Sequence, residues 1–260
     1  MDTITINLGT VFVSFVIYQL IFHFVSSWFS AKVSPCFKDL SLEEKIKWNS
    51  RVGSTCQALV AGVFSLYILL FHEAATADPL WDDPWLVNVN IAIDLGYVIS
   101  GFLLLFFYWR AIGGIEVLIR RCTVIYIYIL VLKEGALAYI ANFRLILHLS
   151  ILFYNQRWFL KTLGYSKSSE AYIINEVFAT VMFFLRIAVI PPFYYCIYRM
   201  YGTDAYISLG LLIQCSWIGS IIVFDVIYVI RMIRILREWV HLSQDTLSHQ
   251  TRESNQKSSS

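Results

Sequence analysis

Six ionisable side chains lie inside long apolar stretches of this sequence. They are Asp94, Arg144, His148, Glu176, Arg186 and Asp225. A charged side chain near the centre of a membrane helix costs roughly 2.5 to 3.5 kcal/mol or more, so such residues usually pair with one another or serve a ligand. Their chemistry allows two interpretations. They form ion pairs between helices, or they bind the polar head of an amphiphile whose tail lies among apolar and aromatic side chains.

The depth of these residues within their segments predicts two polar tiers. At about 1.5 Å per residue, Asp94 and Arg144 both lie about 8 residues, or roughly 12 Å, from the same end of the bundle and could meet. Glu176 and Asp225 lie about 5 to 6 residues from the opposite end, at the level of Arg157. The first tier comprises Asp94 and Arg144, with Arg186 as a further member. The second tier comprises Glu176, Asp225, Arg120 and Arg121.

His148 follows Arg144 by four residues, which places both on one helix face. A histidine there could act as a general base, or it could donate a structural hydrogen bond to a neighbouring helix. The sequence contains no glycine-rich phosphate loop, no Ser-His-Asp order and no HExxH motif. Its cysteines show no metal-ligand spacing. We therefore expect no catalytic residue, no metal and no cofactor.

Seven apolar runs supply the helices that must position these side chains. They span residues 8–29, 52–71, 86–108, 117–132, 136–154, 171–198 and 206–230. Of all residues, 58% are hydrophobic and 15% are charged, against about 25% charged in soluble domains. The chain is therefore predicted to be an all-α integral membrane protein with seven transmembrane helices. The fourth run is shorter than the roughly 17 to 25 residues of a spanning helix, so six spans with a re-entrant pair is the alternative.

The basic residues orient this bundle, because Lys and Arg collect in cytoplasmic loops. With the N-terminus luminal and the C-terminus cytosolic, 16 of the 20 Lys and Arg residues lie on the cytosolic side and only Lys133 and Arg199 on the other. The first span has its positive charges after it and is interpreted as a retained anchor, with a cleaved signal peptide as the alternative. A net charge of +2 excludes nucleic acid as a partner. The expected partners are membrane lipids, and no protein partner is indicated.

Two segments outside the apolar runs carry local signals. Ser41 and Glu44 form a capping box, which predicts a short helix over Leu42–Trp48 with Trp48 at headgroup level. From about residue 241 the sequence becomes polar and rich in serine, which is typical of a disordered tail. We expect an N-terminal helix and loop over 1–40, a bundle over 41–240 and a cytosolic tail over 241–260.

Several segments resemble a known family. They include Trp48-Asn-Ser-Arg51, Ala77-Asp-Pro-Leu-Trp81, Leu137-Ala-Tyr-Ile-Ala-Asn-Phe-Arg144 and Asn155-Gln-Arg-Trp-Phe159. From residue 1 to about 235 the chain is similar to the TRAM, Lag1 and CLN8 homology (TLC) domain family. The resemblance implies one leading helix followed by a six-helix bundle. It also implies an endoplasmic reticulum location and a role in lipid homeostasis.

The departures from that family concern chemistry. In its ceramide synthase branch, a histidine pair transfers an acyl chain from acyl-CoA, but this chain has Arg120-Arg121 there, and guanidinium cannot serve as a base. His148 stands where an acidic residue is expected and Gly101 where a polar one is expected, whereas Asp225 matches. We therefore expect a protein that binds or senses a membrane lipid. The alternatives are a degenerate acyl-CoA-dependent acyltransferase and, on helix count alone, a receptor or transporter.

Overall fold

The structure is a computed structural model of the chain. It describes residues 3–71, 85–134, 138–165 and 169–188, and scattered positions from 191 to 237. The chain divides into two compact units, Met1–Leu211 and Leu212–Ser260, and the helices and polar clusters described in this structure belong to the first unit. Asp225 and the predicted tail over 241–260 lie outside the described residues.

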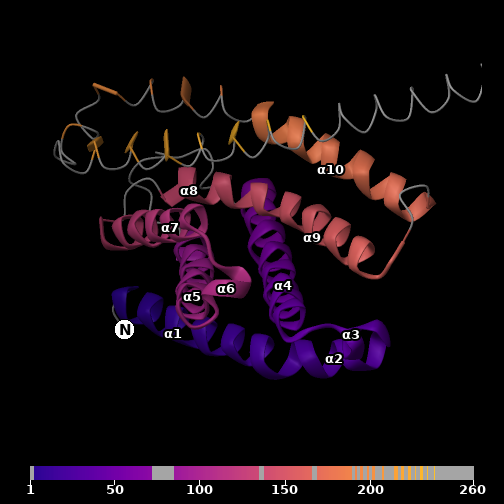
Figure 1. The fold of residues 1–260 in the computed structure, drawn as a ribbon. Coiled ribbons are helices and arrows are strands. Elements are labelled where there is room, and N and C mark those ends of the chain that lie inside the picture. The colour runs from indigo at the N-terminus through magenta and orange to yellow at the C-terminus, as the bar shows by residue number, and fades with distance from the viewer. Residues whose placement is uncertain are drawn as a thin grey trace, which may run out of the picture. The chain divides into compact units, whose positions relative to one another are not determined.

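Every regular element in the described ranges is a helix (Figure 1). The α-helices are α1 (Thr3–Leu20), α2 (Ser26–Val33), α3 (Cys36–Asp39), α4 (Leu42–Phe71), α5 (Trp85–Phe107), α6 (Trp109–Ile112), α7 (Ile115–Glu134), α8 (Ala138–Leu145), α9 (Leu149–Thr162) and α10 (Glu170–Ala188). A π-helical turn, η1 (Ile21–Val25), joins α1 to α2, and a 3-10 turn, η3 (Ile146–His148), joins α8 to α9.

Three helical stretches among the described residues are long and apolar enough to cross a membrane. They are Ile4–Val33, Leu42–Phe71 and Trp85–Phe107. They contain the first two of the seven predicted runs and nearly all of the third. The fourth run falls on α7, the fifth on α8 and α9, and the sixth on α10 and residues beyond it. Most of the seventh run is outside the described residues. The chain is thus a helical membrane protein, and the count of seven spans stays a prediction.

Hydrogen bonds between the long helices show that successive helices run in alternating directions. Ser14 of α1 contacts Ile93 of α5, and Gln19 contacts Ser100, so α1 and α5 are parallel. In α4, Gln57 meets Asp94 and the earlier Arg51 meets Asn155, whereas Ser65 meets Asn90 and Asn142. Helix α4 is therefore antiparallel to both α5 and α8–α9. Alternation of this kind is what a chain that crosses a membrane repeatedly requires.

Close approach of α1 to α5 depends on a glycine. A Cβ atom added to Gly96 would lie 2.5 Å from the carbonyl oxygen of Val11, which is closer than real Cβ contacts allow. Small residues permit such backbone contact between membrane helices. The hydroxyl of Ser14 then donates to the carbonyl oxygen of Ile93 at 2.7 Å.

The capping box is confirmed, but the short helix predicted after it is wrong. Ser41 Oγ lies 2.7 Å from Glu44 Oε2, and the backbone N–H of Ser41 donates to the same oxygen at 3.0 Å. The helix that begins there continues for 30 residues as α4. Trp48 is buried within the protein, because its indole N–H donates to Ser30 and its ring packs against Phe159, and its position at headgroup level stays a prediction.

The fifth predicted run is broken in its middle. The 3-10 turn Ile146–His148 separates α8 from α9, and α9 extends to Thr162, beyond the predicted end at 154. Ser150 Oγ donates to the carbonyl oxygen of Leu147 at 2.7 Å. A serine hydroxyl that bonds back to the preceding turn bends a helix. A 3-10 turn has about 3.0 residues per turn instead of 3.6, so it changes the direction of every side chain that follows.

Candidate functional site

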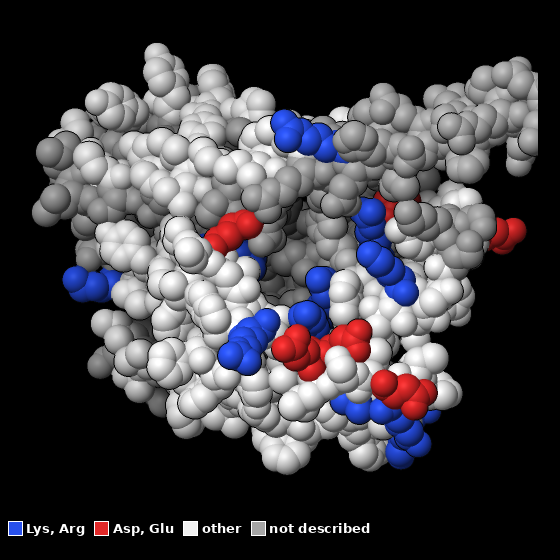
Figure 2. Space-filling view, in the orientation of Figure 1, with Lys and Arg blue, Asp and Glu red and all other residues white. Residues whose placement is uncertain are grey.

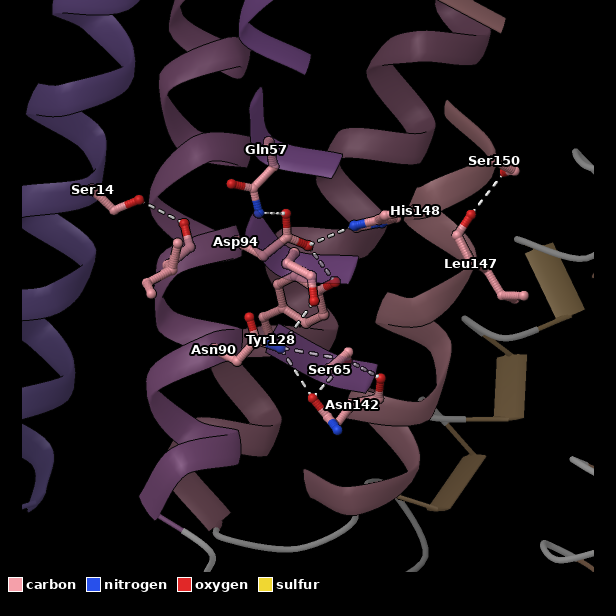
Figure 3. Close-up of polar contacts among 12 residues, drawn as sticks. Ser14, Gln57, Ser65, Asn90, Asp94, Tyr128, Asn142, Leu147, His148 and Ser150 are labelled. Carbon is pink, nitrogen blue, oxygen red and sulfur yellow. Dashed lines mark hydrogen bonds and ion pairs between the residues drawn. The ribbon is translucent and has the colours of Figure 1, made fainter. Parts of the chain in front are cut away.

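A buried carboxylate joins four helices in the interior. Asp94 of α5 is fully buried, and the side-chain amide of Gln57 in α4 donates to its Oδ1 at 2.6 Å (Figure 3). The hydroxyl of Tyr128 in α7 donates to Oδ2 at 2.6 Å. Tyr18 of α1 in turn donates to Oε1 of Gln57. Both carboxylate oxygens accept a hydrogen bond, which offsets the loss of water around this group.

His148 faces the same carboxylate from η3. Its Nδ1 lies 3.8 Å from Asp94 Oδ2, which is beyond hydrogen-bond distance but close enough for electrostatic attraction (Figure 3). The His148 side chain is 22% exposed and that of Asp94 is 1% exposed. We call Tyr18, Gln57, Asp94, Tyr128 and His148 the Asp94 cluster.

Arg144, expected to meet Asp94, lies in α8 and is half-buried. In the contacts described for Asp94, Gln57 and Tyr128 donate hydrogen bonds and His148 lies 3.8 Å away. Four residues after Arg144, the 3-10 turn directs His148 towards the carboxylate. The first tier thus has a basic neighbour for Asp94, but it is the histidine.

Neutral polar side chains form a second buried group, the amide cluster of Ser65, Asn90 and Asn142. Ser65 Oγ donates within this cluster and lies 2.7 Å from Asn142 Oδ1. Asn90 Nδ2 lies 3.0 Å from the same oxygen. These residues tie α4, α5 and α8 together (Figure 3). Ser65, Asn90, Asn142 and Gln57 are not ionisable, so the sequence did not predict them as site residues. Each of them nevertheless interrupts an apolar run.

Four polar residues join α4 to α9 at the other end of the bundle. Asn155 donates through Nδ2 to Ser54 at 2.6 Å and to Thr55 at 2.9 Å. Arg51 donates to Asn155 Oδ1 at 3.1 Å, and its guanidinium lies 4.8 Å from the centre of the Trp158 ring. A cation over an indole face is attracted by the ring. The Arg51 side chain is therefore held on two sides.

The predicted level of Glu176 is confirmed at this same end. Arg157 Nε lies 2.8 Å from Glu176 Oε1, which makes an ion pair between α9 and α10. Arg186, also in α10, has a side chain outside the described residues, and so does Asp225. The second tier is therefore observed in part, with Arg157 as the partner of Glu176.

Arg120 and Arg121 of α7, the arginine pair, are held differently. Arg121 Nη1 lies 3.4 Å from the carbonyl oxygen of Val98, a long hydrogen bond. In the described part of the chain, the buried Nε atoms of both arginines have no hydrogen-bond partner. Among the described residues, Tyr97 and Arg120 lie near Arg121, and neither a phenol nor a guanidinium is an anion at neutral pH.

Gly101 makes room for this guanidinium. A Cβ atom added there would lie 1.7 Å from Arg121 Nη1 and 2.5 Å from Cζ. The absence of a side chain on α5 is thus what allows the Arg121 head to lie against the helix. Two of the departures noted in the sequence, Gly101 and Arg121, are in direct contact and complement each other.

On the face of the molecule shown in Figure 2, positive and negative side chains of the described residues lie among a larger number of uncharged ones. Charged groups of this kind can contact the polar head of a ligand, while the apolar helices around them suit a hydrocarbon chain. Among the described residues, no three His, Cys, Asp or Glu side chains gather as metal ligands would.

Comparison with known proteins identifies relatives of this chain. The TLC domain family model matches residues 47–237. TLC domain-containing protein 4 of Homo sapiens is 54% identical over 224 residues, covering 86% of this chain and 85% of that protein. TLC domain-containing protein 4-B of Xenopus laevis is 44% identical over 88% of each chain. The protein of the same name from Danio rerio is 40% identical over 86% of this chain and 85% of its own. No solved structure matches the sequence. The chain therefore belongs to the TLC domain family.

Proposed function

We propose that this protein binds a membrane lipid in its helix bundle and thereby influences the lipid composition of the membrane. The observation that carries the proposal is the arginine pair, whose buried Nε atoms find no acceptor among the described residues. Burying such a donor without a partner costs about 1 to 3 kcal/mol, and more when it is charged. A bound anionic head would supply the missing acceptors.

The proposed setting is a seven-span protein of the endoplasmic reticulum with a luminal N-terminus and a cytosolic C-terminus. The distribution of Lys and Arg supports this orientation, and the alternating helix directions are consistent with it. In this orientation the arginine pair lies towards the cytosolic leaflet and the amide cluster towards the lumen. A lipid head would enter from the cytosolic side.

Native mass spectrometry of the full chain, purified in mild detergent, tests the proposal. A retained lipid is expected on the wild-type protein, and its amount should fall in the Arg120→Gln/Arg121→Gln variant. Arg110→Gln is the matched control, because Arg110 is an exposed arginine on α6. Protein that is folded yet carries no lipid at any detergent concentration would refute the proposal.

One observation favours a second function, acyl transfer from acyl-CoA. Asp94 faces His148, and a carboxylate beside an imidazole can orient it as a general base. In this alternative, His148 removes the proton of an acceptor amine or hydroxyl, which attacks the thioester, and the CoA thiolate leaves and takes up a proton. Microsomes containing the wild-type protein should then transfer acyl chains, and His148→Ala should abolish the transfer. Absence of turnover with every acyl-CoA tested would exclude this function.

A further inference from the structure

The arginine pair has features that define the chemical class of its ligand. The inference rests on the proposed lipid binding and concerns which head the site accepts. Two cations adjacent in the sequence, Arg120 and Arg121, share one short stretch of α7, and both lie near the phenol of Tyr97. Like charges this close repel each other, so a ligand with more than one negative charge would be favoured.

The donors of this site exceed what one carboxylate can accept. Each guanidinium has five N–H donors in a planar fork that matches phosphate and carboxylate oxygens. The described structure supplies one long bond, from Arg121 to Val98, and leaves both Nε groups without an acceptor. A phosphate monoester offers three oxygens and about −1.5 to −2 charges near neutral pH, whereas a fatty-acid carboxylate offers two oxygens and one charge.

Other basic side chains at this end of the bundle do have hydrogen-bond acceptors. Arg157 has Glu176 at 2.8 Å, and Arg51 has Asn155 and the Trp158 ring. The acceptors Glu176 and Asn155 thus serve other basic groups. Gly101 then fixes where the Arg121 head can lie, because any side chain at residue 101 would occupy the space of the guanidinium.

We infer that Arg120 and Arg121 bind the phosphate group of an anionic amphiphile, with Gly101 as the positioning residue for Arg121. The amphiphile's phosphate could belong to a lipid headgroup or to an acyl-CoA, and the chemistry of recognition is the same for both. The apolar bundle would accept the hydrocarbon chain in either case.

The test uses the full chain in phosphatidylcholine nanodiscs and measures binding of four probes: phosphatidic acid, palmitoyl-CoA, oleate and inorganic phosphate. Wild-type protein should bind phosphatidic acid or palmitoyl-CoA at least about tenfold more tightly than oleate, since one charge-assisted hydrogen bond is worth this much. Whichever of the two binds better identifies the source of the phosphate. Inorganic phosphate, which has no chain, should bind weakly.

Three variants separate the inference from simple loss of folding. Arg120→Gln/Arg121→Gln should lose the preference for phosphate, and Arg110→Gln should retain it. Gly101→Ala should also weaken phosphate binding, because its methyl group displaces the flexible Arg121 head. Gly53→Ala is its matched control, since a Cβ atom there meets nothing within 4 Å. If the double variant does not fold, the comparison of Gly101→Ala with Gly53→Ala decides.

The possible outcomes distinguish this inference from the proposed lipid binding on which it rests. Equal binding of oleate and phosphatidic acid, or phosphate binding that survives both the double variant and Gly101→Ala, would overturn the inference while lipid binding itself stands. Failure of every amphiphile to bind folded wild-type protein would overturn both.

Discussion

Asp94 and Arg121 are both ionisable residues between α5 and α7, but their surroundings differ. Both carboxylate oxygens of Asp94 accept a hydrogen bond at 2.6 Å, and His148 lies beyond them. Arg121 has one bond of 3.4 Å, and its buried Nε has no acceptor among the described residues. A buried charge whose hydrogen bonds the chain supplies is costly to deprive of its partners, whereas a buried charged group without an acceptor is a candidate for ligand binding.

This difference separates the two interpretations of the intramembrane charges. Interhelical pairing describes Asp94 and the Arg157–Glu176 pair, whereas ligand binding is the role that we propose for the arginine pair. In lipid-free detergent no ligand contributes to stability, so substitutions in the two regions should change the free energy of unfolding by different amounts.

Substitution of Asp94 should have the largest effect. Asp94→Leu leaves the Gln57 amide and the Tyr128 hydroxyl without their acceptor, at about 1 to 3 kcal/mol each. We expect the free energy of unfolding to fall by roughly 2 to 6 kcal/mol, measured by urea denaturation in detergent. Asp94→Asn should be milder because its amide oxygen still accepts from Gln57. The control, Asp39→Asn, changes an exposed acid in α3, and equal losses in Asp39→Asn and Asp94→Leu would contradict this account.

Removal of one hydrogen-bond donor to Asp94 should lower the free energy of unfolding by less than removal of the carboxylate. Tyr128→Phe deletes the hydroxyl 2.6 Å from Asp94 Oδ2. A hydrogen bond to a charged group is worth about 1.5 to 3 kcal/mol, and His148 can move closer to compensate in part. We expect a loss at the lower end of this range in the same denaturation experiment. No measurable change would mean that Tyr128 does not hold the carboxylate.

The amide cluster should contribute less again, because its members are neutral. Ser65→Ala removes the hydroxyl that contacts Asn142. Side-chain hydrogen bonds between membrane helices are worth about 0.6 kcal/mol on average and at most about 1.7 kcal/mol. Thr10→Ala serves as the control, since Thr10 bonds only within its own helix to the carbonyl oxygen of Ile6 in the contacts described. A loss for Ser65→Ala as large as that for Asp94→Leu would remove the distinction between charged and neutral clusters.

The arginine pair should show the smallest effect on lipid-free stability. Arg120→Gln/Arg121→Gln removes two guanidinium groups whose buried Nε atoms have no hydrogen-bond partner among the described residues, so the free energy of unfolding should rise slightly or stay within about 1 kcal/mol of wild type. Thermal unfolding followed by tryptophan fluorescence checks this. A large destabilisation would place the pair with the Asp94 cluster as a structural element.

The spans were predictable because a membrane demands long apolar helices, and the first three runs lie almost entirely within the three stretches long enough to cross one. Helix limits were less predictable. The polar turn at Ser41 begins a helix as expected, but that helix continues for 30 residues into the membrane segment, and Trp48 within it packs against Ser30 and Phe159. Such tertiary contacts leave no local signal.

The candidate site was predictable in part for a similar reason. Depth along the helices placed Glu176 with Arg157 correctly, since depth needs only the distance from a helix end. The partners of Asp94 depend on rotation about the helix axis, and the 3-10 turn at Ile146–His148 changes that rotation. The position of the Arg121 guanidinium depends on Gly101, and this dependence arises only because α5 packs against α7.

The lipid-induced shift in melting temperature is the most direct test of the contrast between the two regions. A ligand at about 100 times its Kd stabilises a protein by about 2.7 kcal/mol. Phosphatidic acid should therefore raise the melting temperature of wild-type protein and of Asp94→Asn, although the latter starts lower, and should leave Arg120→Gln/Arg121→Gln unchanged. A shift that persists in the double arginine variant but disappears in Asp94→Asn would contradict the account.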